Sequence, residues 1–408
     1  ESRGLGDVYK RQICRSKLHC QMINKSIPYG RQNITEEDIE AVIETLKSDY
    51  LTQGPKIGEF EKTFAKYVGA KYAVAVNNAT AGLHLSAISL GVNPGDKIIV
   101  TPMTFAASAN CVRYCGGEVV FCDIDKDTYL IDIKKLEDRL RKAPSGTYKG
   151  LILVDFAGYP LNLEAFRKLA DTYGIWIIED ACHAPGGFFK DSKGRRQYCG
   201  NGNWADVSVF SFHPVKHIAT GEGGMVTTNS KELYDKLCLY RTHGITKDSK
   251  LLTENHGGWY YEMQELGFNY RITDFQAALG ISQLKRADAG LKRRQLIARR
   301  YNEAFAKNDN IKTPFVSDDV FHAYHLYIIQ VEDRLGLYNY LREQGIYAQV
   351  HYVPLHLMPY YAQRGNKKGD FPVVEDYYEH CLSLPIYPTL TDEEQSYVIA
   401  NVLRFLNK

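Results

Sequence analysis

A single lysine, Lys216, stands between an aromatic run and a glycine-rich turn in the stretch SVFSFHPVKHIATGEGGM. Residues 207–212 alternate Val, Ser and Phe side chains, which predicts a strand. Pro214 ends that strand, because its ring nitrogen cannot donate to a hydrogen-bond ladder. The strand end therefore presents a primary amine, and an amine is the group that reacts with an aldehyde.

Polar residues follow other apolar runs of the chain in the same way. The run YAVAV is followed by NNATAG, in which Asn78, Thr80 and Gly82 predict the cap and first turn of a helix. The free N–H groups and the positive dipole end of such a helix form an anion site. The run KIIVTP is followed by Phe105, an aromatic side chain at the same edge of the sheet.

Two acids and a histidine close the run IWII, as Glu179, Asp180 and His183. Buried unpaired carboxylates are costly, so we expect these acids to face solvent or a cation. Strand alternation alone does not choose between Glu179 and Asp180 as the acid that serves a ligand. The run VSVFSF contains Ser211 near its end and is followed by His213 and Lys216.

Together these residues describe one ligand. A phosphate would be bound by the helix start and by hydroxyl groups such as those of Thr80 and Ser211, and a flat ring by Phe105. A ring nitrogen that must stay protonated requires a carboxylate such as Asp180, and an aldehyde requires an amine such as Lys216. Pyridoxal phosphate demands this set of groups.

The elements that must position these residues alternate between strand and helix patterns from about residue 60. The strands are nearly continuous apolar runs, which predicts an α/β fold with a mostly parallel sheet and helices on both faces. Ligands of such sheets bind at the carboxyl ends of the strands. We expect a non-native leader over residues 1–21 with Met22 as the native start, a large ligand-binding domain over 22–275 and a smaller α+β domain over 276–408. The segment after Met22 is a candidate to pack on the smaller domain.

The smaller domain is predicted to begin with one long helix from Thr273 to about Lys307. Its basic run LKRRQLIARR is interpreted as a solvated helix face. A strand (YHLYIIQV), a helix, a second strand (AQVHYVP) and closing helices complete the prediction.

Composition excludes several classes of function. The 408 residues are 44% hydrophobic and 24% charged with a formal net charge of +2, which argues against nucleic acid as a partner. No apolar run is long enough for a membrane span, and nine scattered cysteines suit a reducing cytoplasm. The stretch GEGGM lacks the G-K-[ST] of a phosphate-binding P-loop, and Pro214 between His213 and His217 argues against a helical metal pair. No metal is expected.

Several ordered motifs resemble those of the DegT-type sugar-nucleotide aminotransferases, which are fold-type-I pyridoxal-phosphate enzymes similar to aspartate aminotransferase. The resemblance runs from about Ile27 to the C-terminus. It rests on LTQGPKIGEFE, NNATAGLHLS, PMTFAASAN, VDFAG, EDACHAPGG, FSFHPVKHIATGEGG and LGFNYRITDFQAALG. The motifs IPYGRQNI, FSFHPVK and QVHYVPLH resemble in particular those of the UDP-sugar 4-aminotransferases of pseudaminic acid biosynthesis.

The resemblance implies a role for each cofactor residue. Lys216 would link to the aldehyde of the cofactor and move the proton between C4′ and the sugar carbon. The family pattern selects Asp180 as the partner of the pyridinium nitrogen, places His183 near the phenolic oxygen or ring, and stacks Phe105 on the ring. The phosphate would be held by Ala79, Thr80, Ala81 and Ser211, and by Asn269 of a neighbouring protomer in a two-fold homodimer.

The resemblance also implies the substrates. L-glutamate would convert the cofactor to pyridoxamine phosphate, and the amine would pass to the C4 ketone of a UDP-linked 4-keto-6-deoxy-N-acetylhexosamine. Arg271 is a candidate for the carboxylate of the amino donor. Candidate contacts to the nucleotide sugar are Tyr29, Asp49, Tyr50, Leu51, Thr52, His351 and Tyr352.

Three other functions stay open at this point. A different 3- or 4-keto nucleotide sugar would use the same cofactor residues. Members of the family that dehydrate sugars carry histidine in place of the lysine, so Lys216 favours transamination over dehydration. A non-catalytic regulatory role is disfavoured by the complete set of cofactor residues.

Overall fold

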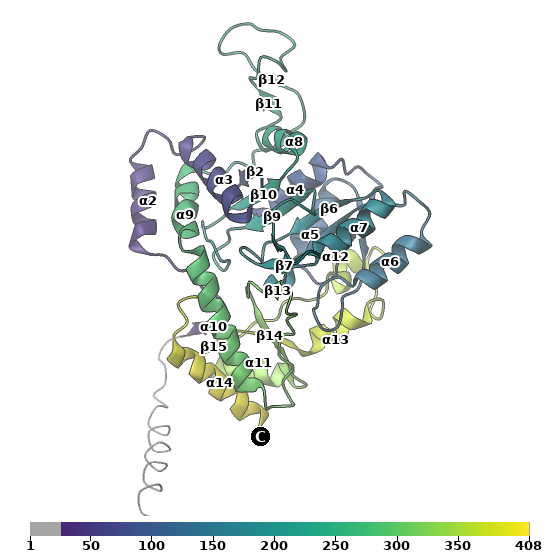
Figure 1. Cartoon of the computed structure of the whole chain (residues 1–408), viewed down its shortest axis with the longest axis vertical. Coiled ribbons are helices and arrows are strands. Elements are labelled where there is room, and N and C mark those ends of the chain that lie inside the picture. Colours follow the sequence, from purple (N-terminus) through teal and green to yellow (C-terminus); the bar gives the residue numbers. More distant parts are fainter. Residues whose placement is uncertain (1–25, 408) are drawn as a thin grey trace, which may run out of the picture.

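The computed structural model describes residues 26–407 (Figure 1). The expected leader over 1–21 and the expected start at Met22 lie outside these residues. Within the described part of the chain, no helix combines the length and the apolar character needed to cross a membrane.

A seven-stranded sheet in the order β2-β10-β9-β6-β5-β3-β4 forms the centre of the fold. β10 pairs antiparallel with β2 and β9, and all the other pairs of neighbours are parallel. The mostly parallel α/β sheet predicted from the sequence is thus confirmed. Its strands are β2 (Tyr72–Val76), β3 (Lys97–Val100), β4 (Glu118–Phe121), β5 (Tyr148–Val154), β6 (Trp176–Asp180), β9 (Val207–Ser211) and β10 (Gly224–Thr228).

Helices cover both faces of the sheet, because each strand buries side chains on both sides. In β6, for example, Ile178 packs in the core under α4, α5 and α8, whereas Ile177 packs in the core of the opposite face. The first face is covered by α4 (Ala79–Ser89), α5 (Ala106–Tyr114) and α8 (Lys231–Arg241). The opposite face is covered by α3 (Pro55–Val68), α6 (Ile133–Lys142), α7 (Leu163–Tyr173) and α9 (Asp274–Leu284).

The single helix predicted from Thr273 to Lys307 is wrong, because two helices occupy this range. Thr273 caps α9 with a reciprocal capping box, and α9 ends at Leu284. A second helix, α10, begins at Ala287 and runs to Phe305. Arg286 between them has φ −108° and ψ 1°, which is outside the helical region.

A second hydrophobic core forms below the sheet in Figure 1, where α10 meets the C-terminal elements. The first strand of the described chain joins this core, because β1 (Ile27–Pro28) pairs with β15 (Ile346–Tyr347). The strand predicted at AQVHYVP is therefore wrong in position: β15 precedes it, and Gln349 keeps one isolated bridge to Ser383. The other elements here are β14 (Tyr327–Gln330), α11 (Arg334–Glu343), β16 (Cys381–Leu384) and α14 (Asp392–Leu406).

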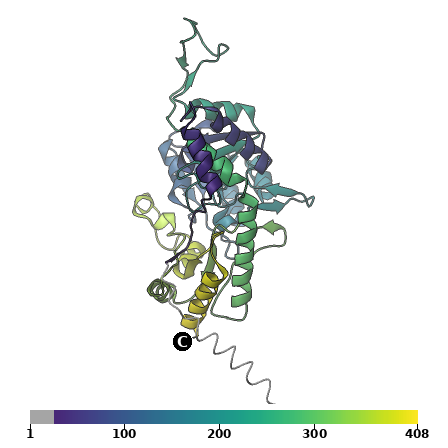
Figure 2. The same ribbon diagram turned by 90° about the vertical axis from the view of Figure 1, so that its left-hand side faces the viewer.

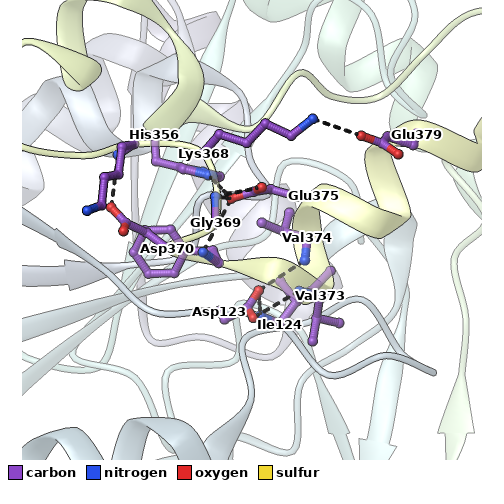
Figure 3. Close-up of polar contacts among 12 residues, drawn as sticks. Asp123, Ile124, His356, Lys368, Gly369, Asp370, Val373, Val374, Glu375 and Glu379 are labelled. Carbon is purple, nitrogen blue, oxygen red and sulfur yellow. Dashed lines mark hydrogen bonds and ion pairs between the residues drawn. The ribbon is translucent and has the colours of Figure 1, made fainter.

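Residues 355–380 contact the edge of the large sheet, and Figure 3 shows Asp123 beside Val373 and Val374 there. Asp123, which follows β4, accepts hydrogen bonds from the backbone N–H groups of Val373 and Val374 at the start of α13 (Pro372–His380). Its carboxylate lies at the positive end of that helix and also pairs with Lys135 at 2.9 Å. Two short helices precede α13, namely η2 (Leu355–Leu357) and α12 (Pro359–Ala362).

A hairpin of β11 (Ile245–Thr246) and β12 (Glu262–Met263) extends beyond the body of the molecule in both views (Figures 1 and 2). It carries exposed Trp259, Tyr261 and Met263. The remaining elements are α2 (Glu36–Leu46), η1 (Phe156–Gly158) and the small antiparallel sheet of β7 (Phe188–Lys190), β8 (Arg196–Tyr198) and β13 (Val320–Phe321).

Candidate active site

A cavity of about 910 Å³ opens where the parallel strands of the large sheet end. This is the edge at which the sequence predicts ligand binding. The second core also reaches the cavity, through His325, His351 and Tyr352. The expected site residues that line it are Tyr29, Ala79, Thr80, Ala81, Phe105, Asp180, His183, Ser211, Lys216, His351 and Tyr352.

The start of α4 forms the anion-binding wall. The Asn78 side chain caps the helix by accepting a hydrogen bond from the Ala81 N–H at 2.8 Å. Residues Ala79 and Thr80 follow the cap and line the cavity, where N–H groups of a first turn have no intrahelical acceptor. Ser211, at the end of β9, adds a hydroxyl to the same cavity. These groups can bind a phosphate.

Asp180 and Glu179 lie on opposite faces of the sheet, and this decides which acid serves the cavity. Asp180 points to the same side of the sheet as Ile178, two residues earlier, and lines the cavity beside α5. It accepts hydrogen bonds from Ser108 Oγ at 2.6 Å and from the Cys182 N–H at 3.2 Å. No lysine or arginine within residues 26–407 forms a salt bridge with it at 4.0 Å or less. Asp180 can therefore pair with a cationic group of a ligand.

Glu179 is buried on the opposite face and does not line the cavity. It accepts hydrogen bonds from the Gly200 N–H and from Ser208 Oγ. Burial raises the pKa of Glu179, and burial next to Glu179 raises that of Asp155 well above its usual range, so the two carboxyl groups hold a proton between them. The expectation that the acids face solvent or a cation is wrong for Glu179, which is 1% exposed and faces away from the cavity, whereas Asp180, although only 6% exposed, lines the cavity.

Lys216 lies in a turn directly after β9. The turn closes through the hydrogen bond from the Lys216 N–H to the His213 carbonyl at 2.8 Å. The residue as a whole is half-buried, but its amine lies inside the cavity, and burial of the amine lowers the pKa of Lys216 to about 8. At pH 7 about a tenth of such amines are neutral, roughly three hundred times the fraction for an ordinary lysine. Lys216 is thus suited to attack a carbonyl carbon.

Histidine and aromatic rings form the rest of the wall. His183 Nδ1 accepts a hydrogen bond from the Ala157 N–H at 3.2 Å, which leaves the proton of the neutral ring on Nε2, 3.4 Å from the Tyr352 hydroxyl. His351 is fixed by Ser383 at 2.8 Å. Phe105 is 62% exposed at the mouth, with its ring 6.2 Å from that of Tyr352. The wall can therefore contact a flat ring and a polar ligand together.

The structure does not bring every expected site residue into this cavity. The segment Asp49–Thr52 is exposed, as is Asn269, and Arg271 is half-buried outside the cavity. The segment Asp49–Thr52 lies beside the start of α9, a few residues after Asn269 and Arg271 in the chain, because Thr52 bridges Thr273 and the Asp274 N–H donates to the Leu51 carbonyl. On one chain they form a surface patch separate from the cavity.

Four functional residues escaped the sequence analysis. Ser108 donates a hydrogen bond to Asp180, and a hydroxyl in the first turn of the helix after β3 was the available signal. Tyr270 lines the cavity and contacts His84 Nδ1 at 3.1 Å. His325 and Arg294 come from the C-terminal part of the chain. Arg294 corrects the solvated interpretation of the basic run: it is 1% exposed and donates to the carbonyl groups of Tyr324 and Ile386.

A lysine of lowered pKa, a carboxylate without a protein cation and an open helix start meet at the carboxyl ends of a mostly parallel sheet. This fold and this donor set define a pyridoxal-phosphate-dependent enzyme of fold type I. A model of the DegT/DnrJ/EryC1/StrS aminotransferase family matches residues 32–403, and the chain belongs to that family. It is a pyridoxal-phosphate-dependent sugar aminotransferase.

Relatives of known sequence cover nearly the whole chain. An uncharacterized protein of Methanocaldococcus jannaschii is 42% identical over 95% of this chain and 100% of its own. The spore coat polysaccharide biosynthesis protein SpsC of Bacillus subtilis is 40% identical over 94% and 97%. A UDP-4-amino-4,6-dideoxy-N-acetyl-beta-L-altrosamine transaminase of Campylobacter jejuni is 38% identical over 94% and 98%.

Solved structures agree in fold over the same range. A putative sugar aminotransferase of Streptococcus pneumoniae in its PMP form superposes with a TM-score of 0.85 at 31% identity, covering 93% of this chain and 99% of that one. PseC of Helicobacter pylori, an aminotransferase of pseudaminic acid biosynthesis, superposes with a TM-score of 0.83 at 31% identity, covering 94% and 100%.

Proposed function

We propose that this enzyme moves an amino group from L-glutamate to the C4 ketone of a UDP-linked 4-keto-6-deoxy-N-acetylhexosamine, and that Lys216 is its catalytic lysine. The observation that carries the proposal is the cavity in which Lys216, Asp180 and the start of α4 meet. Bound pyridoxal phosphate supplies the electron sink that lets the amino group be released and passed on.

Different residues of the cavity would contact different groups of the cofactor. The first turn of α4 and Ser211 would hold the phosphate, and Asp180 would keep a proton on the ring nitrogen. His183 would present its Nε2 proton to the phenolic oxygen, since its Nδ1 is occupied by the Ala157 N–H. Lys216 would hold the cofactor through its amine and would carry a proton to and from the substrate carbon, for which its lowered pKa is suited.

The choice of sugar rests on relatives and on the far wall of the cavity. The transaminase from C. jejuni and PseC from H. pylori are named for this type of amino sugar or its pathway. Tyr29, His351 and Tyr352 lie in the motifs IPYGRQNI and QVHYVPLH and line the cavity opposite the sheet. A second candidate is another nucleotide sugar, since a GDP-perosamine synthase of Escherichia coli is 32% identical over 93% of the chain.

A panel of keto sugars separates these two candidates. We expect the UDP-linked 4-keto-6-deoxy-N-acetylhexosamine to be aminated at least about tenfold more efficiently than GDP- or dTDP-linked 4-keto-6-deoxyhexoses, which corresponds to a difference of about 1.4 kcal/mol in transition-state binding. Glutamate with labelled nitrogen and mass analysis of the sugar product would measure this. Higher efficiency with a GDP- or dTDP-linked sugar would replace the proposed substrate while retaining the aminotransferase.

We further propose that two chains share each active site in a two-fold homodimer. Among the described residues, Lys216 is the one lysine or arginine that lines the cavity, although the proposed donor and nucleotide sugar are both anionic. The patch of Asp49–Thr52, Asn269 and Arg271 carries polar groups without a ligand on its own chain. Exposed apolar side chains lie on α2 and on the segment itself (Ile39, Ile43, Leu46, Tyr50 and Leu51), and others lie on the hairpin of β11 and β12 (Trp259, Tyr261 and Met263).

Asn269 provides the test of a shared site. Its neighbour Tyr270 faces the cavity of the same chain, so Asn269 on the same extended segment faces away and would serve the partner. In a mixed dimer of a Lys216→Ala chain and an Asn269→Ala chain, one site has both defects and the other has none. Each mixed dimer should regain about half of the wild-type activity.

Differently tagged chains allow the mixed dimer to be purified before its activity is measured. The matched control pairs the Lys216→Ala chain with a Tyr270→Ala chain. Tyr270 lines the cavity of its own chain together with Lys216, so each site of this pairing carries one of the two defects and no activity should be recovered. Absence of recovery in the Asn269 pairing would show that Asn269 acts in its own chain or not at all.

A further inference from the structure

The amine of Lys216 has one polar side-chain partner within hydrogen-bonding distance among the described residues. This partner is His325, whose Nε2 lies 3.4 Å from Lys216 Nζ. His325 is 4% exposed and lines the cavity, and its ring packs on that of His183 with centroids 4.3 Å apart. The ring therefore lies between the two cavity groups that face the proposed cofactor.

The backbone around His325 is fixed from two sides. Arg294 of α10 donates to the carbonyl groups of Tyr324 and His325, at 3.1 and 3.4 Å, and to that of Ile386 at 2.9 Å. The Leu326 N–H donates to the Ala157 carbonyl in the large domain at 3.1 Å. A guanidinium buried this deeply costs several kcal/mol unless its donors are paired, so these carbonyl contacts tie the segment firmly to α10.

His325 is unsuited to accept a proton from Lys216. Burial and the nearby charge of Lys216 lower the pKa of His325 well below its usual range, so the ring stays neutral at neutral pH. Other charged or titratable groups around Lys216 are Asp180, Cys182, His183, His217, Arg294 and His351.

We propose that His325 is a positioning residue that holds the Lys216 amine, by a neutral hydrogen bond from the cavity wall, at the point where it must meet the cofactor and the substrate carbon. This inference rests on the proposed role of Lys216. A lysine has four rotatable side-chain bonds, and a fixed partner at its end restricts the amine to the reactive geometry. Arg294 acts one step further out, because it fixes the backbone that carries His325.

Two amide substitutions that differ by one methylene test this hydrogen bond. In His325→Gln the amide reaches the former position of Nε2, whereas in His325→Asn it stops near the former position of Nδ1. Both are neutral and polar. If His325 acts by a hydrogen bond to Lys216, the Gln variant should keep the function of the wild type and the Asn variant should lose it. If the imidazole of His325 transfers a proton, the two variants should be equally impaired.

The measurement uses protein freed of its cofactor and follows, as a function of pH, the rate at which Lys216 binds added pyridoxal phosphate, called capture below. In the wild type the rate should rise with pH and level off above a midpoint near pH 8, because the neutral amine reacts and burial lowers the pKa of Lys216 to about 8. The limiting rate at high pH should fall about tenfold or more in His325→Asn and stay within about threefold in His325→Gln. The midpoint should remain near pH 8 in both.

His217→Gln is the matched control. His217 Nε2 donates to the Ala323 carbonyl at 2.8 Å in the same segment, but His217 does not line the cavity. An amide can replace that donor, so capture should match the wild type. Thermal unfolding of all three variants shows whether any effect comes from lost stability.

Each outcome decides between the proposals. A limiting rate unchanged in His325→Asn overturns the positioning role, as does equal impairment of the Asn and Gln variants or of the His217→Gln control. Capture by a lysine other than Lys216, found by peptide mapping, overturns the proposed function as well. Capture on Lys216 with no effect of His325 overturns the positioning role alone.

Discussion

Replacement of Lys216 by alanine should lower amino transfer to below about one thousandth of the wild-type rate, because the variant loses both its attachment point for the cofactor and its proton carrier. No other lysine of the described residues lines the cavity, so no second amine can take over. Product formation from glutamate and the keto sugar measures the loss. Borohydride reduction of the wild-type enzyme, followed by peptide mapping, should find the cofactor on the Lys216 peptide.

Lys231→Ala is a suitable control, since Lys231 is an exposed lysine of α8 that pairs with Asp235 on the helix surface. It should retain wild-type activity and labelling. The Lys216→Ala variant should also keep the fold, because removing a buried amine of lowered pKa relieves a desolvation cost. Label on another lysine, or substantial transfer by the alanine variant, would contradict the assignment.

The large sheet could be predicted because each of its strands is marked by a short run of residues in the sequence. Runs such as YAVAV and VSVFSF are apolar on both faces, and such runs are typical of buried parallel strands. Since all their carboxyl ends meet at one edge, residues after different strands converge without any knowledge of their contacts. For this reason Asp180, Ser211 and Lys216 were expected together, and they line one cavity.

The sequence of β6 alone could not show which of its residues face which side of the sheet, because both faces of this strand are buried. Glu179 and Asp180 are both acids with little exposure, and only the helices that cover each face distinguish them. The proton held between Glu179 and Asp155 likewise depends on a neighbouring strand. Sequence reasoning considered each acid by itself and expected both to face solvent or a cation.

Contacts that join distant parts of the chain explain the other errors. Arg294 looks like one of several basic residues on an exposed helix until the carbonyl groups of Tyr324 and Ile386 are placed beside it. His325 reaches Lys216 across 109 positions of sequence. Arg286, at the break between α9 and α10, pairs with Asp38 of α2, whose carboxylate lies 2.8 Å from the guanidinium.

Replacement of Asp180 by asparagine should lower kcat by at least about a hundredfold while pyridoxal phosphate still binds. The substitution keeps the shape of the side chain and an oxygen to accept from Ser108 Oγ, but it removes the negative charge. Without that charge the ring nitrogen of the cofactor loses its proton and the ring withdraws electrons less strongly, an electrostatic loss of about 3 kcal/mol or more. Rapid-mixing kinetics with glutamate alone would measure the effect on the first half-reaction.

Glu179→Gln is the matched control one residue earlier on the same strand. Its amide oxygen can accept from Ser208 and the Gly200 N–H, and its amide nitrogen can donate to Asp155 in place of the shared proton. We therefore expect kcat within a few-fold of the wild type. A severe loss in Glu179→Gln together with a mild one in Asp180→Asn would mean that the acid on the opposite face of the sheet serves the cofactor. Glu179 does not line the cavity that Lys216 and α4 share. That result would therefore also require the cofactor ring to be oriented differently in the cavity.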